Sequence, residues 1–168
     1  HLYLLKIVDV GQLANRPHHI HNTFPLISPS IYWACNYKKI PVVQTLHNYR
    51  LLCPSANLFF NGKIYESSLG KLFPFKAVKD RVYRDSFFGT LVVALMLFFH
   101  RIIGTWNNKV TLYISLTDFQ KEKMIEGGLS EDLIVVKPNF ISDEKEIVSS
   151  DILDIEVNCP VFLFVGRL

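Results

Sequence analysis

The sequence has little cysteine, and its cysteines are scattered. Cys35, Cys53 and Cys159 are the only three, and no two of them form a Cys-x-x-Cys pair. An odd number of distant cysteines predicts neither a disulfide framework nor a structural zinc site. We therefore expect a reducing compartment, the cytoplasm.

Long apolar runs and an excess charge of one sign are also lacking. With 18 basic and 15 acidic residues the net charge is only +3, which gives no general argument for nucleic acid, and we expect no such partner. The most hydrophobic stretch, Leu91–Phe99, is too short to span a bilayer, which needs about 20 residues. We expect it to be a buried helix, in a chain whose 49% apolar content favours a well-packed globular body.

Short apolar runs alternate with helical patterns, which predicts an α/β fold, a Rossmann-like doubly wound parallel sheet. Capping and turn residues give approximate bounds for the elements. The expected helices run from Ser28-Pro29 to about Lys39, from Asp85 or Ser86 to about Gly104, and from Thr117 to Gly127-Gly128. One expected strand ends at Ile20, and the others cover Pro41–Leu46, Thr111–Ser115, Leu133–Lys137 and Val161–Val165. A hairpin is expected with its turn at Asn61-Gly62.

Polar side chains follow several of these strands. The first run is followed by His21-Asn22-Thr23, the second by His47-Asn48-Tyr49-Arg50, and later runs by Pro138-Asn139 and Gly166-Arg167. Ligands of parallel sheets bind beyond the carboxyl ends of the strands. Turn chemistry explains part of this pattern, because Asn, Thr and Pro are ordinary turn residues. Two His-Asn pairs at successive strand ends nevertheless favour a binding crevice.

Four segments together resemble glycosyltransferase family 4. They are HNTFPLISPSIYWA (His21–Ala34), PVVQTLHNYRLLCP (Pro41–Pro54), VVKPNF (Val135–Phe140) and FVGRL (Phe164–Leu168). The resemblance implies the GT-B architecture, in which two Rossmann-like domains face a cleft. It implies an acceptor in the first domain, a nucleotide sugar such as a UDP- or GDP-hexose in the second, and transfer with retention of the anomeric configuration.

The resemblance also implies roles for individual residues. His47 matches the histidine that faces the donor sugar, and Arg167, with Gly166, matches the arginine turn that neutralises the donor diphosphate. An arginine fork suits phosphate oxygens, so this role is physically sensible. The implied acceptor and cleft residues are His21, Asn22, Thr23, Asn48, Tyr49, Arg50 and Asn139.

The chain also departs from the family pattern. The family's glycine-rich loop after its first strand is absent, because His1–Ala14 contains only Gly11, and the Glu-x7-Glu segment of the donor domain would lie beyond Leu168. No Asp-x-Asp occurs, so the design that uses this pair to hold a cation is not predicted, and we expect no metal and no cofactor. A nucleotide-binding regulatory domain would need a glycine-rich phosphate loop, and none is present.

We expect a fragment of a larger protein: an acceptor-side domain over residues 1–140, a linker over 141–160, and the first strand of a donor domain over 161–168. The full enzyme would transfer a hexose to a saccharide or a lipid-linked saccharide in polysaccharide or envelope glycan synthesis, in the cytoplasm or on the inner face of the membrane. The fragment alone would be inactive. The alternative is a non-catalytic module that binds a glycan or a partner.

Three groups of residues have an alternative interpretation. His47 could be a buried histidine with one hydrogen bond at a strand end. His18, His19 and His21 could suggest a metal, but no nearby carboxylate or cysteine completes a ligand set. The basic and aromatic residues between Lys63 and Phe88 could form a solvated face with its aromatic rings in the core, or a surface that docks on anionic lipid headgroups.

Overall fold

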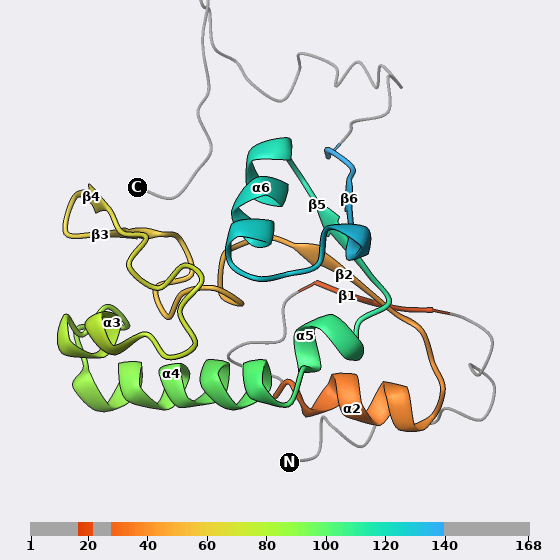
Figure 1. The fold of residues 1–168 in the computed structure, drawn as a ribbon, viewed down its shortest axis with the longest axis horizontal. Coiled ribbons are helices and arrows are strands. Elements are labelled where there is room, and N and C mark those ends of the chain that lie inside the picture. Colours follow the sequence, from red (N-terminus) through yellow and green to blue (C-terminus); the bar gives the residue numbers. More distant parts are fainter. Residues whose placement is uncertain (1–16, 22–27, 140–168) are drawn as a thin grey trace, which may run out of the picture.

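The computed structural model describes residues 17–21 and 28–139 of the chain. In chain order, the elements are β1 (His18–Ile20), α2 (Ser30–Tyr37), β2 (Val42–Leu46), β3 (Phe59–Phe60), β4 (Lys63–Ile64), α3 (Phe75–Lys79), α4 (Phe87–Ile102), α5 (Thr105–Asn108), β5 (Leu112–Ser115), α6 (Asp118–Glu126), a 3-10 helix (Glu131–Leu133) and β6 (Ile134–Val136). Four parallel strands form the main sheet in the order β1-β2-β5-β6, and helices flank it (Figure 1). The predicted α/β fold with a parallel sheet is confirmed.

Local sequence signals fix several element ends. Ser86 caps α4, and its hydroxyl accepts a hydrogen bond from the Gly89 amide at 3.1 Å. Thr117 caps α6 in the same way through the Gln120 amide. Asn61 and Gly62 both have positive φ, 49° and 74°, as a two-residue hairpin turn between β3 and β4 requires. These predicted caps and this turn are confirmed.

Other details were not predicted. No sequence pattern predicted the short helices α3 and α5 or the 3-10 helix, each five residues or fewer. Helix α2 begins one residue later than expected, with Pro29 in the cap position. Gln120 does not reach back to the cap residue in a full capping box; its side-chain oxygen accepts from the Leu116 amide and the Ser115 hydroxyl instead. The expected linker and the strand at 161–165 lie outside the described residues.

One face of the sheet is buried by the helices. Successive strands align Gln44 with Tyr113 and Tyr113 with Ile134, so these side chains share a face. All three side chains are buried. The apolar core on this face also includes residues of α2, α4, α5 and α6. A doubly wound sheet carries helices on both faces. In this structure α2, α4, α5 and α6 contribute to the core on this one face.

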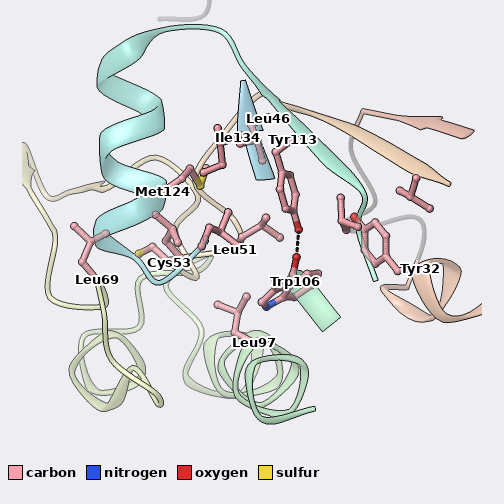
Figure 2. Packing of buried hydrophobic residues seen from close by; sticks show 14 of the residues in the cluster. Tyr32, Leu46, Leu51, Cys53, Leu69, Leu97, Trp106, Tyr113, Met124 and Ile134 are labelled. Carbon is pink, nitrogen blue, oxygen red and sulfur yellow. Dashed lines mark hydrogen bonds between the residues drawn. The ribbon is translucent and has the colours of Figure 1, made fainter. Parts of the chain in front are cut away.

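Two hydrogen bonds inside this core link helices to strands. The Tyr113 hydroxyl donates to the Trp106 carbonyl at 2.9 Å, which links β5 to α5 (Figure 2). The Tyr32 hydroxyl donates to the Gln44 side-chain oxygen at 2.9 Å, which links α2 to β2. Burial raises the pKa of the Tyr113 hydroxyl well above its usual value, so it remains a donor. Each pair ties one helix to one strand.

Thr105 joins three elements through one buried hydroxyl. This hydroxyl accepts from the Trp33 indole N–H at 2.9 Å and lies 2.8 Å from His100 Nδ1. Thr105 itself is fully buried, and burial lowers the pKa of His100. A neutral His100 can accept the hydroxyl proton, so the chain of bonds is complete from α2 through α5 to α4.

We predict that Thr105→Val lowers the free energy of unfolding by about 1–3 kcal/mol, because it leaves the Trp33 N–H and His100 Nδ1 without their partner. Denaturant unfolding followed by tryptophan fluorescence measures the change. Thr105→Ser is the matched control, since it keeps the hydroxyl and loses only a methyl group. Equal stability of Thr105→Val and the parent chain would contradict this role.

Helix α4 differs from expectation in its burial. The predicted buried helix over Leu91–Phe99 buries only one side, through Val93, Ala94 and Leu97. Val92 and Phe99, on another side, are 65% and 56% exposed. The interpretation that the neighbouring aromatic rings lie in the core is wrong for the exposed rings Phe75, Phe87 and Phe88. Among the described residues, no helix is long and apolar enough to cross a membrane.

Candidate functional site

Three histidine rings stack at the ends of β1 and β2. The ring centroids of His19 and His21 are 4.6 Å apart, and those of His21 and His47 are 5.1 Å apart. His21 Nδ1 and His47 Nε2 lie 2.8 Å apart and share a hydrogen bond. His19 Nε2 lies 2.7 Å from the Thr45 hydroxyl. The predicted site residues His21 and His47 are therefore in direct contact.

Strand periodicity explains why these side chains meet. Side chains alternate between the two faces of a strand. Because Gln44 and its neighbours in the register point into the core, His19 on β1 and Thr45 on β2 take the opposite face. His21 and His47 follow these two residues by two positions each, just past the ends of the strands. Thr45 was not among the predicted site residues, although its spacing of two positions from His47 was the available signal.

The histidines line a pocket at the carboxyl edge of the sheet. Its volume is about 210 Å³. The lining comes from four strands or the residues that follow them: His19, His21, Thr45, His47, Ile114, Leu116, Lys137, Pro138 and Asn139. The structure thus brings His21, His47 and Asn139, three of the predicted site residues, together in one pocket. It adds His19, Thr45 and Lys137, which were not expected to belong to the site.

The pocket favours neutral imidazole at His47. Its pKa is lowered from the usual value, first by desolvation and then by the neighbouring His21 and His19. Between two neutral imidazole rings, one donates and the other accepts the shared hydrogen bond. The ring nitrogens outside that bond can then exchange hydrogen bonds with hydroxyl groups of a ligand. The Lys137 and Asn139 side chains add a cation and an amide to the same pocket.

Three predicted cleft residues have other contacts. The Asn48 side-chain oxygen accepts from the Arg50 amide at 3.0 Å, which is a local turn bond. The Arg50 guanidinium donates to the Pro54 carbonyl and lies 5.1 Å from the centre of the Tyr83 ring. Tyr49 packs against the hydrophobic core. These contacts shape the loop after β2, and none of the three residues lines the pocket.

The remaining predicted site residues lie outside the described part of the chain. They are Asn22 and Thr23, expected on the acceptor side, and Gly166 and Arg167, expected at the donor diphosphate. Within residues 17–21 and 28–139, no three His, Cys, Asp or Glu side chains are placed to hold a metal ion. Three of the stacked ring nitrogens already have protein partners, at His19 Nε2, His21 Nδ1 and His47 Nε2.

A second cavity, of about 240 Å³, lies between the carboxyl-terminal ends of α4 and α6. Arg101 lines it, and its guanidinium donates to the backbone carbonyls of Lys71, Leu51 and Leu52. The arginine is therefore occupied in holding the loop after β2 against α4. None of the predicted site residues that the structure describes lines this cavity.

Comparisons of the chain with models of known protein families, with curated proteins and with solved structures find no match in any of the three. The pocket geometry and the four resembling segments are therefore the basis for a functional proposal.

We predict that His47 titrates below the usual histidine pKa of 6.5, because its imidazolium would be desolvated beside two other histidines. A lowered pKa in the folded state means that the stability contribution is complete above pH 6.5 and is lost as the pH falls through the folded-state pKa. NMR titration of the His47 ring measures this pKa. His21→Ala should raise it, since one repelling neighbour is removed. A pKa of 6.5 or higher in the parent chain would contradict the prediction.

Proposed function

We propose that the chain is the acceptor-side domain of a retaining GT-B glycosyltransferase similar to family 4, with the Rossmann-like, doubly wound fold of that architecture. The observation that carries the proposal is the contact between His21 and His47. These residues belong to two separate segments that resemble the family, and they meet 2.8 Å apart in one pocket at the carboxyl edge of a parallel sheet.

The size of the pocket fits one wall of a cleft. Complete small-molecule sites have volumes of roughly 300–1,000 Å³. At about 210 Å³, the pocket of the described residues is smaller than this range. It has room for part of a saccharide, and in the proposed enzyme a donor domain supplies the opposite wall.

In the proposed reaction His47 and His21 position hydroxyl groups of the sugars by hydrogen bonds. A diphosphate leaving group needs positioning and charge stabilisation more than a strong base. Arg167, with Gly166, is proposed to stabilise the charge on the diphosphate as the bond to the sugar breaks. Asn139 and Lys137 lie across the pocket from the histidines' strands, on the segment after β6, and are proposed to hold the acceptor.

The substrates follow from the same proposal. The donor is a nucleotide sugar such as a UDP- or GDP-hexose, and the acceptor is a saccharide or a lipid-linked saccharide. Transfer uses no metal and no other cofactor, and it takes place in the cytoplasm as a step of polysaccharide or envelope glycan synthesis. In this proposal, residues 141–160 form the linker between the two domains.

We predict that the complete protein transfers hexose from one member of a panel of nucleotide sugars to a saccharide acceptor, and that His47→Ala lowers kcat/KM at least tenfold, because a positioning hydrogen bond is lost. Radiolabelled donors and product chromatography measure transfer. Tyr37→Ala, at an 83% exposed ring on α2, is the control and should keep the parent rate.

Two results would overturn the proposal. Unchanged transfer by a folded His47→Ala variant would remove His47 from the site. The second result is that the complete protein binds a saccharide but transfers hexose from no donor, and that it lacks a second Rossmann-like domain with paired glutamates. This result would favour the alternative, a non-catalytic glycan- or partner-binding module.

A further inference from the structure

Helix α4 presents an exposed apolar stripe. Its residues are Phe88, Val92, Leu95, Phe99 and Ile102, with exposed fractions between 38% and 76%. They recur every three or four positions and therefore share one side of the helix. Buried Val93, Ala94 and Leu97 lie on another side, against the core. Figure 1 shows α4 at the lower edge of the ribbon, with α3 beside its amino-terminal part.

Aromatic contacts extend the stripe onto α3. Phe75, at 77% exposure, lies 4.5 Å from Phe73 between ring centroids, and Phe73 lies 5.6 Å from Phe98 on α4. Phe98 in turn contacts Phe99 in the stripe at 5.5 Å. Exposed Phe75 thus connects with the stripe through a row of rings. An apolar surface of this kind on a described helix marks an interaction site.

The charge on this part of the molecule has one predominant sign. From Ser86 to His100 the chain contains no Asp, Glu, Lys or Arg, so the stripe itself is uncharged. Residues 71–104 carry six basic side chains and only two acidic ones: Lys71, Lys76, Lys79, Arg81, Arg84 and Arg101 against Asp80 and Asp85. Asp80 accepts a hydrogen bond from the Tyr65 hydroxyl at 2.8 Å.

The basic side chains beside the stripe are available to an anionic partner. Lys76, Lys79, Arg81 and Arg84 are all exposed. The ion pairs found among the described residues involve Lys121 and Lys123 instead, on α6. Lys76 and Arg84 lie over the faces of Tyr65 and Tyr83. Neither forms an ion pair with a carboxylate within residues 17–21 and 28–139. Uncompensated cations bordering an apolar face complement a surface that is apolar inside and anionic at its boundary.

We propose that the α4 stripe is a docking surface for an anionic lipid bilayer, with the stripe in the headgroup and acyl-chain boundary and the lysines and arginines of α3 and the α3–α4 connection on the lipid phosphates. The helix has 16 residues and a length of about 24 Å, which is shorter than the roughly 30 Å hydrocarbon core. It therefore lies along the surface, as interfacial amphipathic helices do.

Charge distinguishes a bilayer from a second copy of the chain. The spacing of the stripe would also suit a pair of helices packed against each other. Such a pair would bring two copies of the same basic surface together. The exposed carboxylate in residues 71–104 that could offset their positive charge is Asp85. Anionic headgroups offset all of these charges at once, and each basic residue near such a surface adds to the attraction.

The test is flotation of the complete protein with two kinds of vesicle, phosphatidylcholine alone and phosphatidylcholine with about one third phosphatidylglycerol. We expect flotation with the anionic vesicles and an at least tenfold weaker association with the neutral ones. Phe88→Ser with Val92→Ser should weaken binding at least tenfold by removing apolar contact, and Lys76→Glu with Arg84→Glu should do so by removing cations.

Matched controls change equal numbers of exposed residues elsewhere. Tyr37→Ser with Phe119→Ser removes two exposed rings on α2 and α6, and Lys38→Glu with Lys39→Glu changes the net charge as much as the α3–α4 charge variant does. Both controls should float like the parent protein. Circular dichroism of every variant shows that its fold is retained, so that loss of binding reports on the surface.

Three results would overturn the proposal: no flotation with anionic vesicles, flotation that is indifferent to phosphatidylglycerol, or equal weakening by the stripe variants and their controls. Sedimentation that shows a dimer, dissociated by Phe88→Ser with Val92→Ser, would assign the stripe to a second copy instead. The docking surface does not depend on the proposed transfer reaction. Vesicle binding without hexose transfer would refute the enzyme alone, and transfer without vesicle binding would refute the docking surface alone.

Discussion

The alternation of side chains along β1 and β2 is the constraint on which the site depends. Val42, Gln44 and Leu46 are buried against the helices, so Thr45 between them must point to the other face of the sheet. His47 follows Thr45 by two positions, so it lies on the same face as Thr45, just past the end of β2. A shift of register by one residue would exchange the two faces and would separate the histidines from each other. Core packing therefore determines the geometry of the pocket without any of the core residues touching it.

The helices are tied to this sheet through polar groups as well as through apolar contact. Tyr32 bonds to Gln44, Tyr113 to the Trp106 carbonyl, and Thr105 to both Trp33 and His100. Each of these bonds joins two different elements, and the Trp33–Thr105 bond connects residues 72 positions apart in sequence. Satisfied polar groups of this kind fix one arrangement of a core, because any other arrangement leaves a buried donor or acceptor unpaired.

Much of the fold could be predicted from the sequence where the signal was local. The Ser86 and Thr117 caps, the Asn61-Gly62 turn and the apolar strand runs each depend on neighbouring residues. Short α3 and α5 gave no periodic pattern long enough to recognise. The exposed side of α4 was also not predictable, because the sequence pattern of an apolar helix is the same whether one side or all sides are buried.

The site could be predicted only as far as strand ends could be identified. His21, His47 and Asn139 follow strands and share a pocket, whereas Asn48 and Arg50 follow the same strand and form a turn. Residue type could not separate these two outcomes. Lys137 joins the pocket because β6 pairs with β5, a neighbour relation that depends on the order of strands in the sheet.

That strand order has a consequence for how the chain folds during synthesis. In the described sheet β2 pairs with β1, β5 with β2, and β6 with β5, so each strand adds beside the strand of this sheet that precedes it. Among the four described strands, none must be inserted between two others that are already paired. The sheet can grow outward from one edge as the polypeptide leaves the ribosome, and the imidazole pair of the first two strands can assemble before α6 has been translated.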